Sequence, residues 1–168
     1  MDKIQAALSG RRLVLRISGR GSFKHSKEIK EYILDRLEKD ANICIFDLKE
    51  CVSMDSTFMG MLAGLSFILK PREGKAMYLA NLNLNTRNLL NTLGLMNFIL
   101  EKQIEELSDK FQFKELNFKE AKTTGVAKHM LESHKALVKI DDKNRKSFKA
   151  VVKSLEDSIK KDKKDKEK

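Results

Sequence analysis

The fold is decided by residues 43–60, which read ICIFDLKECVSMDSTFMG. The first half is a short apolar run, typical of a strand buried on both faces. The second half places Asp55 directly before Ser56 and a further apolar run, which predicts a helix that begins with Asp55 as its N-cap. Ser56 then lies in the first helical turn, where a phosphate would meet free backbone N–H groups and the positive end of the helix.

Strands and helices alternate on both sides of this stretch. Apolar residues at every second position around Ser9-Gly10 predict a hairpin, and helical spacing recurs between the later strands. Because helices separate those strands, we expect right-handed crossovers and a largely parallel sheet. The expected strands cover residues 4–8, 13–17, 42–52 and 76–82, and the expected helices cover 26–39, 55–69 and 86–98.

The chain after residue 107 has a different character. Residues 111–118 predict an edge strand, and two very polar helices with narrow apolar stripes follow, which indicate an appended helical hairpin or a helix that needs a partner. The last residues, 161–168, carry no apolar side chain and predict a disordered basic tail. We therefore expect an α/β domain over 1–118, a helical extension over 119–160 and the tail over 161–168.

The fold class that these patterns predict is α/β. We expect a mixed, largely parallel sheet of about four to five strands, packed by helices and followed by the helical C-terminal extension. The longest apolar stretch, residues 58–69, contains two glycines and a serine and falls short of the roughly 20 residues that cross a bilayer. No signal peptide is recognisable at the start, and Cys44 and Cys51 form no disulfide framework, so we expect a cytoplasmic protein with no membrane span.

The net charge of +10 raises nucleic acid and anionic membranes as partners. Half of that charge lies in residues 139–168, where acidic side chains are interspersed among the basic ones. The basic end, residues 160–168, has no aromatic side chain that could stack on bases. We therefore expect no direct binding of nucleic acid.

A scan for catalytic chemistry finds no machinery. Gly74-Lys75 is followed by Ala76, where a phosphate-binding loop needs Ser or Thr. His129 and His134 are five residues apart, on different faces of a helix, and we interpret them, like His25, as surface histidines. The sequence thus predicts a protein that is not an enzyme and that holds no cofactor or metal.

The order of elements resembles the STAS domain family, whose best-known soluble members are anti-sigma factor antagonists. The resemblance runs from Ile4 to Phe118 and includes Asp47 in FDL, Asp55-Ser56 and the segment LLNTLGLMNFI at 89–99. In that family the residue after the Asp of a DS-S/T-G-L-G type segment is the phosphorylated serine or threonine, which is Ser56 here. Phe58 stands in place of the first glycine of that segment, and the loop 19–23 lacks the acidic residue often found there.

The resemblance implies a partner-switching protein. In its unphosphorylated form it would bind an anti-sigma factor that is also a serine kinase, and would so free a sigma factor. The kinase would then phosphorylate the antagonist from ATP, and a metal-dependent protein phosphatase would reset it, so ATP and Mg²⁺ would belong to the partners. The alternative is a non-switching STAS interaction module, such as a scaffold or a subunit of a lipid-transport complex. The polar C-terminal helices also allow a homo-oligomer.

The candidate site follows from this resemblance. Ser56 is the expected phosphorylation site, with Thr57 as the second choice, and Asp55 would cap the helix and orient the site. Gly60 would permit the close approach of a partner, as its missing side chain leaves room. The expected partner contacts, of which Met54 and Met59 serve equally well as core residues, are Gly21, Ser22, Phe23, Met54, Asp55, Phe58, Met59 and Gly60.

Overall fold

The computed structural model describes residues 1–69, 74–104, 111–118 and 125–167. In this part of the chain a mixed seven-stranded sheet has the order β6-β5-β3-β2-β1-β7, and β4 pairs with β2 beside this path. β1 is antiparallel to β2 and β7, and the other pairs are parallel. The strands are β1 (Lys3–Ser9), β2 (Arg12–Gly21), β3 (Ile43–Asp47), β4 (Cys51–Met54), β5 (Ala76–Ala80), β6 (Leu100–Lys102) and β7 (Lys114–Glu115).

The α/β class and the mixed, mostly parallel sheet are confirmed. The sheet has more strands than expected because β4 and β6 are only four and three residues long, too short to show a period of two. The expected strand over 42–52 is in fact two strands, since the chain turns between Asp47 and Cys51. The edge strand expected over 111–118 is present as β7 beside β1, shortened to two residues.

The helices of the sheet domain also match the expected pattern. They are α1 (Phe23–Lys39), α2 (Ser56–Ile68), α3 (Leu84–Thr92) and the 3-10 turn η1 (Leu95–Asn97). α1 begins at Phe23, before the expected residue 26, because Ser22 caps it and accepts a hydrogen bond from the Lys24 N–H at 3.2 Å. The helix expected over 86–98 is divided at Gly94, whose φ of 74° is left-handed and ends α3.

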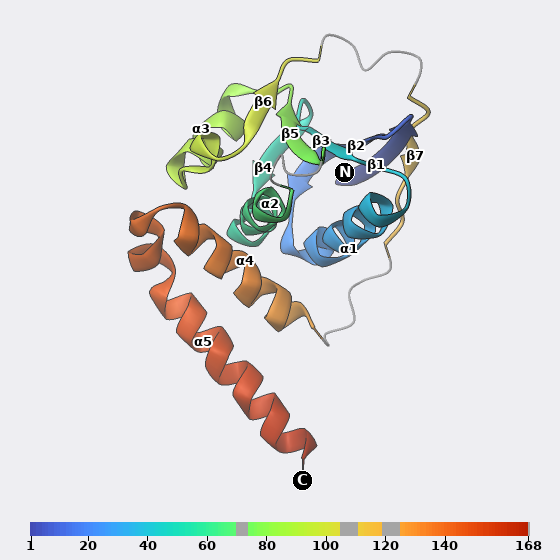
Figure 1. The fold of residues 1–168 in the computed structure, drawn as a ribbon. Helices are drawn as coiled ribbons and strands as arrows, with labels where there is room; N and C mark the ends of the chain where they lie inside the picture. Colours follow the sequence, from blue (N-terminus) through green and yellow to red (C-terminus); the bar gives the residue numbers. More distant parts are fainter. Residues whose placement is uncertain (70–73, 105–110, 119–124, 168) are drawn as a thin grey trace.

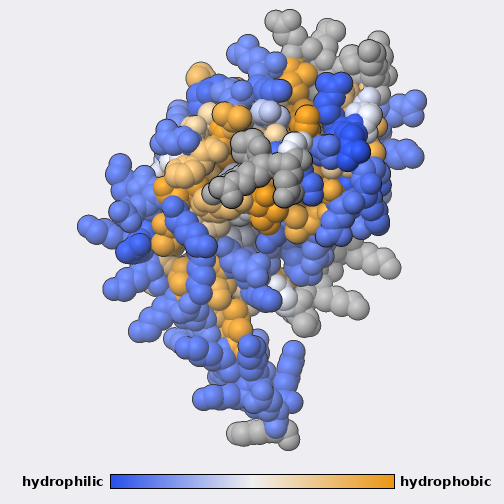
Figure 2. Space-filling model, viewed as in Figure 1, coloured by the Kyte–Doolittle hydropathy of each residue, from blue (hydrophilic) through white to orange (hydrophobic). Residues whose placement is uncertain are grey.

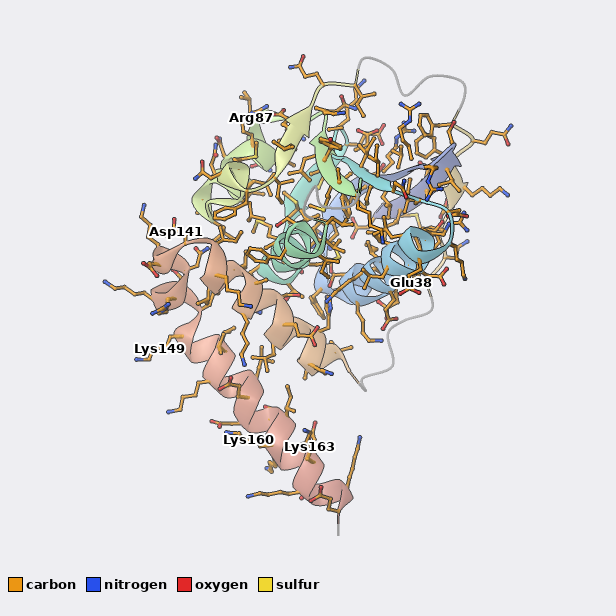
Figure 3. The ribbon with its side chains drawn as sticks, viewed as in Figure 1. Glu38, Arg87, Asp141, Lys149, Lys160 and Lys163 are labelled. Atoms are coloured by element: carbon orange, nitrogen blue, oxygen red, sulfur yellow. The ribbon has the colours of Figure 1, made fainter. Side chains whose placement is uncertain are left out.

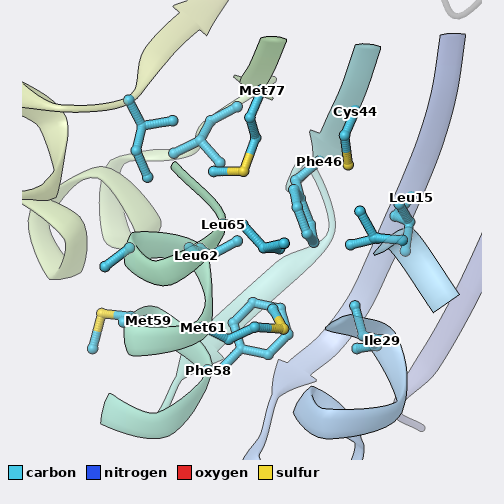
Figure 4. Close-up of a cluster of buried hydrophobic side chains, with 14 of the residues drawn as sticks. Leu15, Ile29, Cys44, Phe46, Phe58, Met59, Met61, Leu62, Leu65 and Met77 are labelled. Atoms are coloured by element: carbon cyan, nitrogen blue, oxygen red, sulfur yellow. The ribbon is translucent and has the colours of Figure 1, made fainter. Parts of the chain in front are cut away.

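The core lies between the sheet and the helices α1 and α2 (Figure 4). Phe46 of β3 and Phe58 of α2 are both fully buried, and their rings meet edge to face with centroids 6.5 Å apart. Phe58 was expected to contact a partner, and that expectation is wrong. Its side chain points from α2 into the sheet and is closed off from any other molecule.

Two further helices, α4 (Val126–Ile140) and α5 (Asp142–Lys166), form an antiparallel hairpin. α4 runs along α2 and α1 on the side away from the sheet, and α5 lies outside α4 and ends away from the domain (Figure 1). Asp141 is the N-cap of α5 and accepts a hydrogen bond from the Lys143 N–H at 2.9 Å. We call residues 126–166 the α4–α5 hairpin.

The expectation of a disordered tail from residue 161 is wrong for residues 161–166, which continue α5. Lysine is a good helix former, and the side chains of this last segment remain in water, so the helix needs no apolar partner there. Lys160 and Lys163 lie on this exposed part of α5 (Figure 3). Figure 2 shows apolar residues as a strip along the hairpin, flanked by hydrophilic ones. Within the described residues, no helix has both the length and the apolar character that a membrane span requires.

Candidate functional site

Asp55 connects the first turns of two helices. Its Oδ1 accepts a hydrogen bond from the Phe58 N–H of α2 at 2.8 Å, and its Oδ2 accepts one from the Phe23 N–H of α1 at 2.7 Å. The N-cap role expected for Asp55 is therefore present, with Phe58 as the donor. One carboxylate satisfies an otherwise unpaired N–H on each helix, which fixes α1 and α2 relative to each other.

The sheet brings these two helix starts together. β2 and β4 are parallel neighbours that end side by side, with Gly21 opposite Met54, and the Asp55 N–H donates to the Gly21 carbonyl at 3.0 Å. A Cβ on Gly21 would lie 2.7 Å from the Phe58 ring, so only glycine lets the strand end pass this close to α2. The loop 21–23 and the start of α2 thus form one continuous surface.

Ser56, the first residue of α2, is half-buried, and its hydroxyl contacts a histidine of α4. The Ser56 Oγ lies 2.9 Å from His134 Nε2, and His134 Nδ1 lies 2.7 Å from the Met130 carbonyl oxygen. Because a carbonyl can only accept, Nδ1 carries the proton, and in the neutral ring Nε2 is the acceptor. The Ser56 hydroxyl therefore donates its proton to His134 Nε2.

The second histidine of α4 makes a matching contact with α1. His129 Nε2 lies 2.8 Å from the Ser26 Oγ, and both side chains are buried. Burial, with Lys30 as a smaller contribution, lowers the pKa of His129 to about 4. The interpretation of His129 and His134 as surface histidines is wrong, because their hydroxyl partners lie on helices far away in the sequence.

α2 and α4 approach closely at a glycine. An ideal Cβ on Gly60 would lie 2.3 Å from the Ser133 carbonyl oxygen, whereas one on Gly64 would lie 3.9 Å from the Ala136 Cβ. Gly60 thus does allow a close approach, as expected from the sequence, but the approaching segment is the chain's own α4. α2 contains no charged residue, and α4 covers the face that the sheet does not.

The remaining predicted site residues divide into exposed and buried ones. Phe23 keeps 43% of its surface exposed beside Asp55, and Ser22 caps α1. Thr57, the second choice for phosphorylation, is only 3% exposed, which makes its hydroxyl a poor acceptor for another enzyme's phosphoryl group. Met54 and Met59 are buried at 7% and 6% exposure and serve as core residues.

Sequence reasoning missed three residues at this end of the molecule. His134 was found in the sequence but was assigned to the surface. Val52 of β4 and Leu84 at the start of α3 expose 60% and 80% of their surfaces, and the Asn85 side chain joins the two segments by donating to the Val52 carbonyl at 2.5 Å. The signal that could have revealed the role of His134 is the run 56–68, which contains no charged residue: a helix that is apolar on all sides must be buried both against the sheet and against another segment.

The titratable groups nearby do not form a metal centre. The described residues contain no group of three or more His, Cys, Asp or Glu side chains placed to hold a metal ion. Cys44 and Cys51 are buried free thiols, and burial raises the pKa of each. The arrangement around Ser56 is a capped helix start with one hydroxyl in contact with one imidazole.

Comparison with known proteins gives a family for most of the sheet domain. Residues 3–111 match the STAS domain family. No curated protein matches the chain.

Solved structures with a similar fold include three anti-sigma factor antagonists. A putative one from Thermotoga maritima is 16% identical with a TM-score of 0.51, and the match covers 57% of this chain and 82% of that one. One from Mycobacterium paratuberculosis is 14% identical with a TM-score of 0.51, covering 66% of this chain and 91% of that one. SpoIIAA of Bacillus in its phosphorylated form is 19% identical with a TM-score of 0.49, covering 59% and 90%.

Proposed function

Because this chain belongs to the STAS domain family, we propose that it is an anti-sigma factor antagonist that switches partners through phosphorylation of Ser56. The unphosphorylated protein binds an anti-sigma factor that is also a serine kinase, and a sigma factor is released. The kinase then transfers phosphate from ATP to Ser56, and a metal-dependent phosphatase removes it. The ATP and Mg²⁺ chemistry belongs to these partners.

The placement of Ser56 carries this proposal. It is the first residue of α2, directly after the capping Asp55, and is half-buried where the neighbouring Thr57 is fully buried. The Ser56 hydroxyl points to His134 of α4 rather than into the core between α2 and the sheet. It is the less buried of the two hydroxyls in the Asp55-Ser56-Thr57 segment.

The effect of a phosphate at Ser56 is electrostatic. It adds about −1.5 to −2 charges next to the Asp55 carboxylate, on a surface where a partner would dock. Each ~1.4 kcal/mol of repulsion or uncompensated desolvation weakens binding tenfold. A misplaced interfacial charge costs several kcal/mol, which is enough to dissociate a tight complex.

The partner surface extends over the loops that meet around Asp55. Phe23 exposes an apolar side chain beside Asp55, and Val52 of β4 and Leu84 of α3 expose theirs where Asn85 joins β4 to α3; exposed apolar side chains with a polar surround are typical of a protein-binding site. Phe58 and the two methionines, Met54 and Met59, support this surface from below. The proposed contact set thus keeps Phe23 from the expected residues and adds Val52 and Leu84.

The test is a phosphorylation assay with the cognate kinase. The full chain is incubated with its anti-sigma kinase and ATP, and the modified residue is mapped by mass spectrometry. We expect one phosphate, on Ser56, and none on Ser56→Ala. Ser53→Ala, a change on β4 close to the site, serves as the matched control and should be labelled normally. Phosphate found only on other residues would refute the assignment.

The second candidate is a non-switching STAS interaction module. One observation favours it: the Ser56 hydroxyl is already bonded to His134 and half-covered by α4. The two functions differ in the response of partner affinity to charge. Ser56→Ala and Ser56→Asp bind the partner equally in a non-switching module, whereas in a switch Ser56→Asp binds more weakly. Calorimetry with the purified partner measures this difference.

A further inference from the structure

The face of α2 that begins at Ser56 is already occupied by a helix of the same chain. α4 contacts Ser56, Gly60 and Gly64 along successive turns of α2, so its axis follows the face that a partner of the site would use. Among the pairs of helices, α4 packs most extensively against α2 on one side and against α5 on the other (Figure 1). The site is therefore closed in this structure by residues 126–140.

α4 packs Ala136, Leu137 and Ile140 into the core, and three polar contacts fix its position on the domain. His134 bonds to Ser56 on α2, His129 bonds to Ser26 on α1, and Lys30 of α1 pairs with Glu132 at 3.3 Å. Between them, small residues meet at Gly60 and Ser133. Such contacts depend on matched geometry, and a single added group between α2 and α4 removes the fit.

α5 braces α4 so that the two helices form one unit. The Asn144 side chain donates to the Leu137 carbonyl of α4 at 2.8 Å and to the Leu93 carbonyl at 3.0 Å, and Lys135 pairs with Glu156 at 2.7 Å. The Phe148 ring of α5 meets the His134 ring edge to face, with centroids 5.1 Å apart. The residue that contacts Ser56 is thus held from behind by α5.

We propose that the α4–α5 hairpin is an internal competitor for the Ser56 surface: it must leave α2 before a partner or kinase reaches Ser56, and a phosphate on Ser56 keeps it from returning. This inference rests on the proposed function for the role of phosphorylation. The competition between α4 and an added charge at Ser56 is a property of the chain itself.

The phosphoryl transfer shows why both states cannot coexist. The γ-phosphorus of ATP forms a bond to Ser56 Oγ, its bond to the ADP oxygen breaks, and the hydroxyl proton leaves to a base of the kinase. In the docked state that proton is donated to His134 Nε2, and α4 covers the hydroxyl. After transfer, a phosphorus atom and three oxygens would have to lie between Ser56 Oγ and His134 Nε2, which are only 2.9 Å apart when α4 is docked, so α4 cannot return to the same place.

The competition changes apparent affinity in a defined way. A partner that binds only the undocked state has its affinity reduced by the fraction of molecules in that state. Variants that undock α4 without adding a charge at Ser56, such as His129→Ala, should therefore bind a partner more tightly, whereas a charge at Ser56 also repels the partner.

The first test needs no partner. Hydrogen exchange is measured by mass spectrometry on the full chain and on Ser56→Glu. We expect exchange of residues 126–140 to accelerate about tenfold or more, while β2 and β3 stay protected. Ser53→Glu places the same charge on β4, away from α4, and is the matched control that should leave α4 protected. Unchanged protection of α4 in Ser56→Glu would overturn the inference.

The second test locks α4 in place. The ideal Cβ positions of residues 64 and 136 lie 3.9 Å apart, close to the ~3.8 Å typical of a disulfide. In the double variant Gly64→Cys, Ala136→Cys, the native thiols Cys44 and Cys51 are buried and compete little. We expect the oxidised form to be phosphorylated on Ser56 by the kinase at least about tenfold more slowly than the reduced form.

The outcomes separate this inference from the proposed function. Equal labelling of the oxidised and reduced forms would overturn the internal competitor and leave the phosphorylation of Ser56 intact. No labelling of either form, nor of the unchanged chain, would count against the proposed function, and the exchange measurement would then decide the inference alone. Slow labelling of the oxidised form that recovers on reduction supports both.

Discussion

The substitution Gly60→Ala tests the packing of α4 on α2 most directly. The added methyl group would lie 2.3 Å from the Ser133 carbonyl oxygen, 2.5 Å from its carbon and 2.8 Å from its Cβ. These atoms include backbone, which cannot rotate away, so α4 has to shift. Overpacking of this kind costs about 1–3 kcal/mol, while replacing a helical glycine with alanine returns about 1 kcal/mol. We expect a net loss of up to about 2 kcal/mol in the free energy of unfolding.

Gly64→Ala is the matched control because it lies one turn further along the same helix. Its methyl group would lie 3.9 Å from the Ala136 Cβ, an ordinary contact, so the helix gain of about 0.5–1 kcal/mol remains. The two variants should therefore differ by about 2 kcal/mol, although both make the same chemical change.

The assay is urea denaturation of the full chain followed by circular dichroism, with thermal melts as a second measure. A loss of about 2 kcal/mol in Gly60→Ala corresponds to a fall in Tm of roughly 4–8 °C for a chain of this size. Hydrogen exchange should place the weakened region in α4 and not in the central strands. Equal stability of the two variants, or an increase in both, would refute the close approach of Ser133 to Gly60.

Three further predictions concern the site and the hairpin. Asp55→Ala removes the acceptor for the Phe58 and Phe23 N–H groups and should cost about 1–2 kcal/mol in urea denaturation, with Asp55→Asn in between. The folded pKa of His129 is about 4 against ~6.5 in the unfolded chain, so stability should fall as the pH drops from about 6.5 to about 4, because only the unfolded chain takes up the proton. Solvent screening reduces that loss to about 1–2 kcal/mol. His129→Gln should make the free energy of unfolding depend less on pH between about 4 and 6.5. An unchanged pH dependence in this variant would contradict a buried neutral His129. Deletion of residues 161–168 removes exposed side chains and should change the free energy of unfolding by less than about 0.5 kcal/mol; a larger loss would show that the end of α5 supports the fold.

The sequence alone predicted the α/β class, the hairpin of β1 and β2 and the start of α2. Local patterns carry that information: alternation around Ser9-Gly10 predicted the hairpin of β1 and β2, and Asp55 before an apolar run predicted the cap. Because these interactions join residues that are close in the chain, both partners of each interaction lie within one short segment and can be recognised there.

Only the tertiary structure decided what surrounds Ser56. His134 and His129 looked like surface residues because their serine partners, Ser56 and Ser26, lie 78 and 103 positions away in the chain. Phe58 looked like a contact residue because an apolar side chain beside a helix start fits the core and an interface equally. Burial depends on which segments pack against each other. The packing of α4 on α2, a helix without charged residues, depends on side-chain shapes in two segments far apart in the sequence.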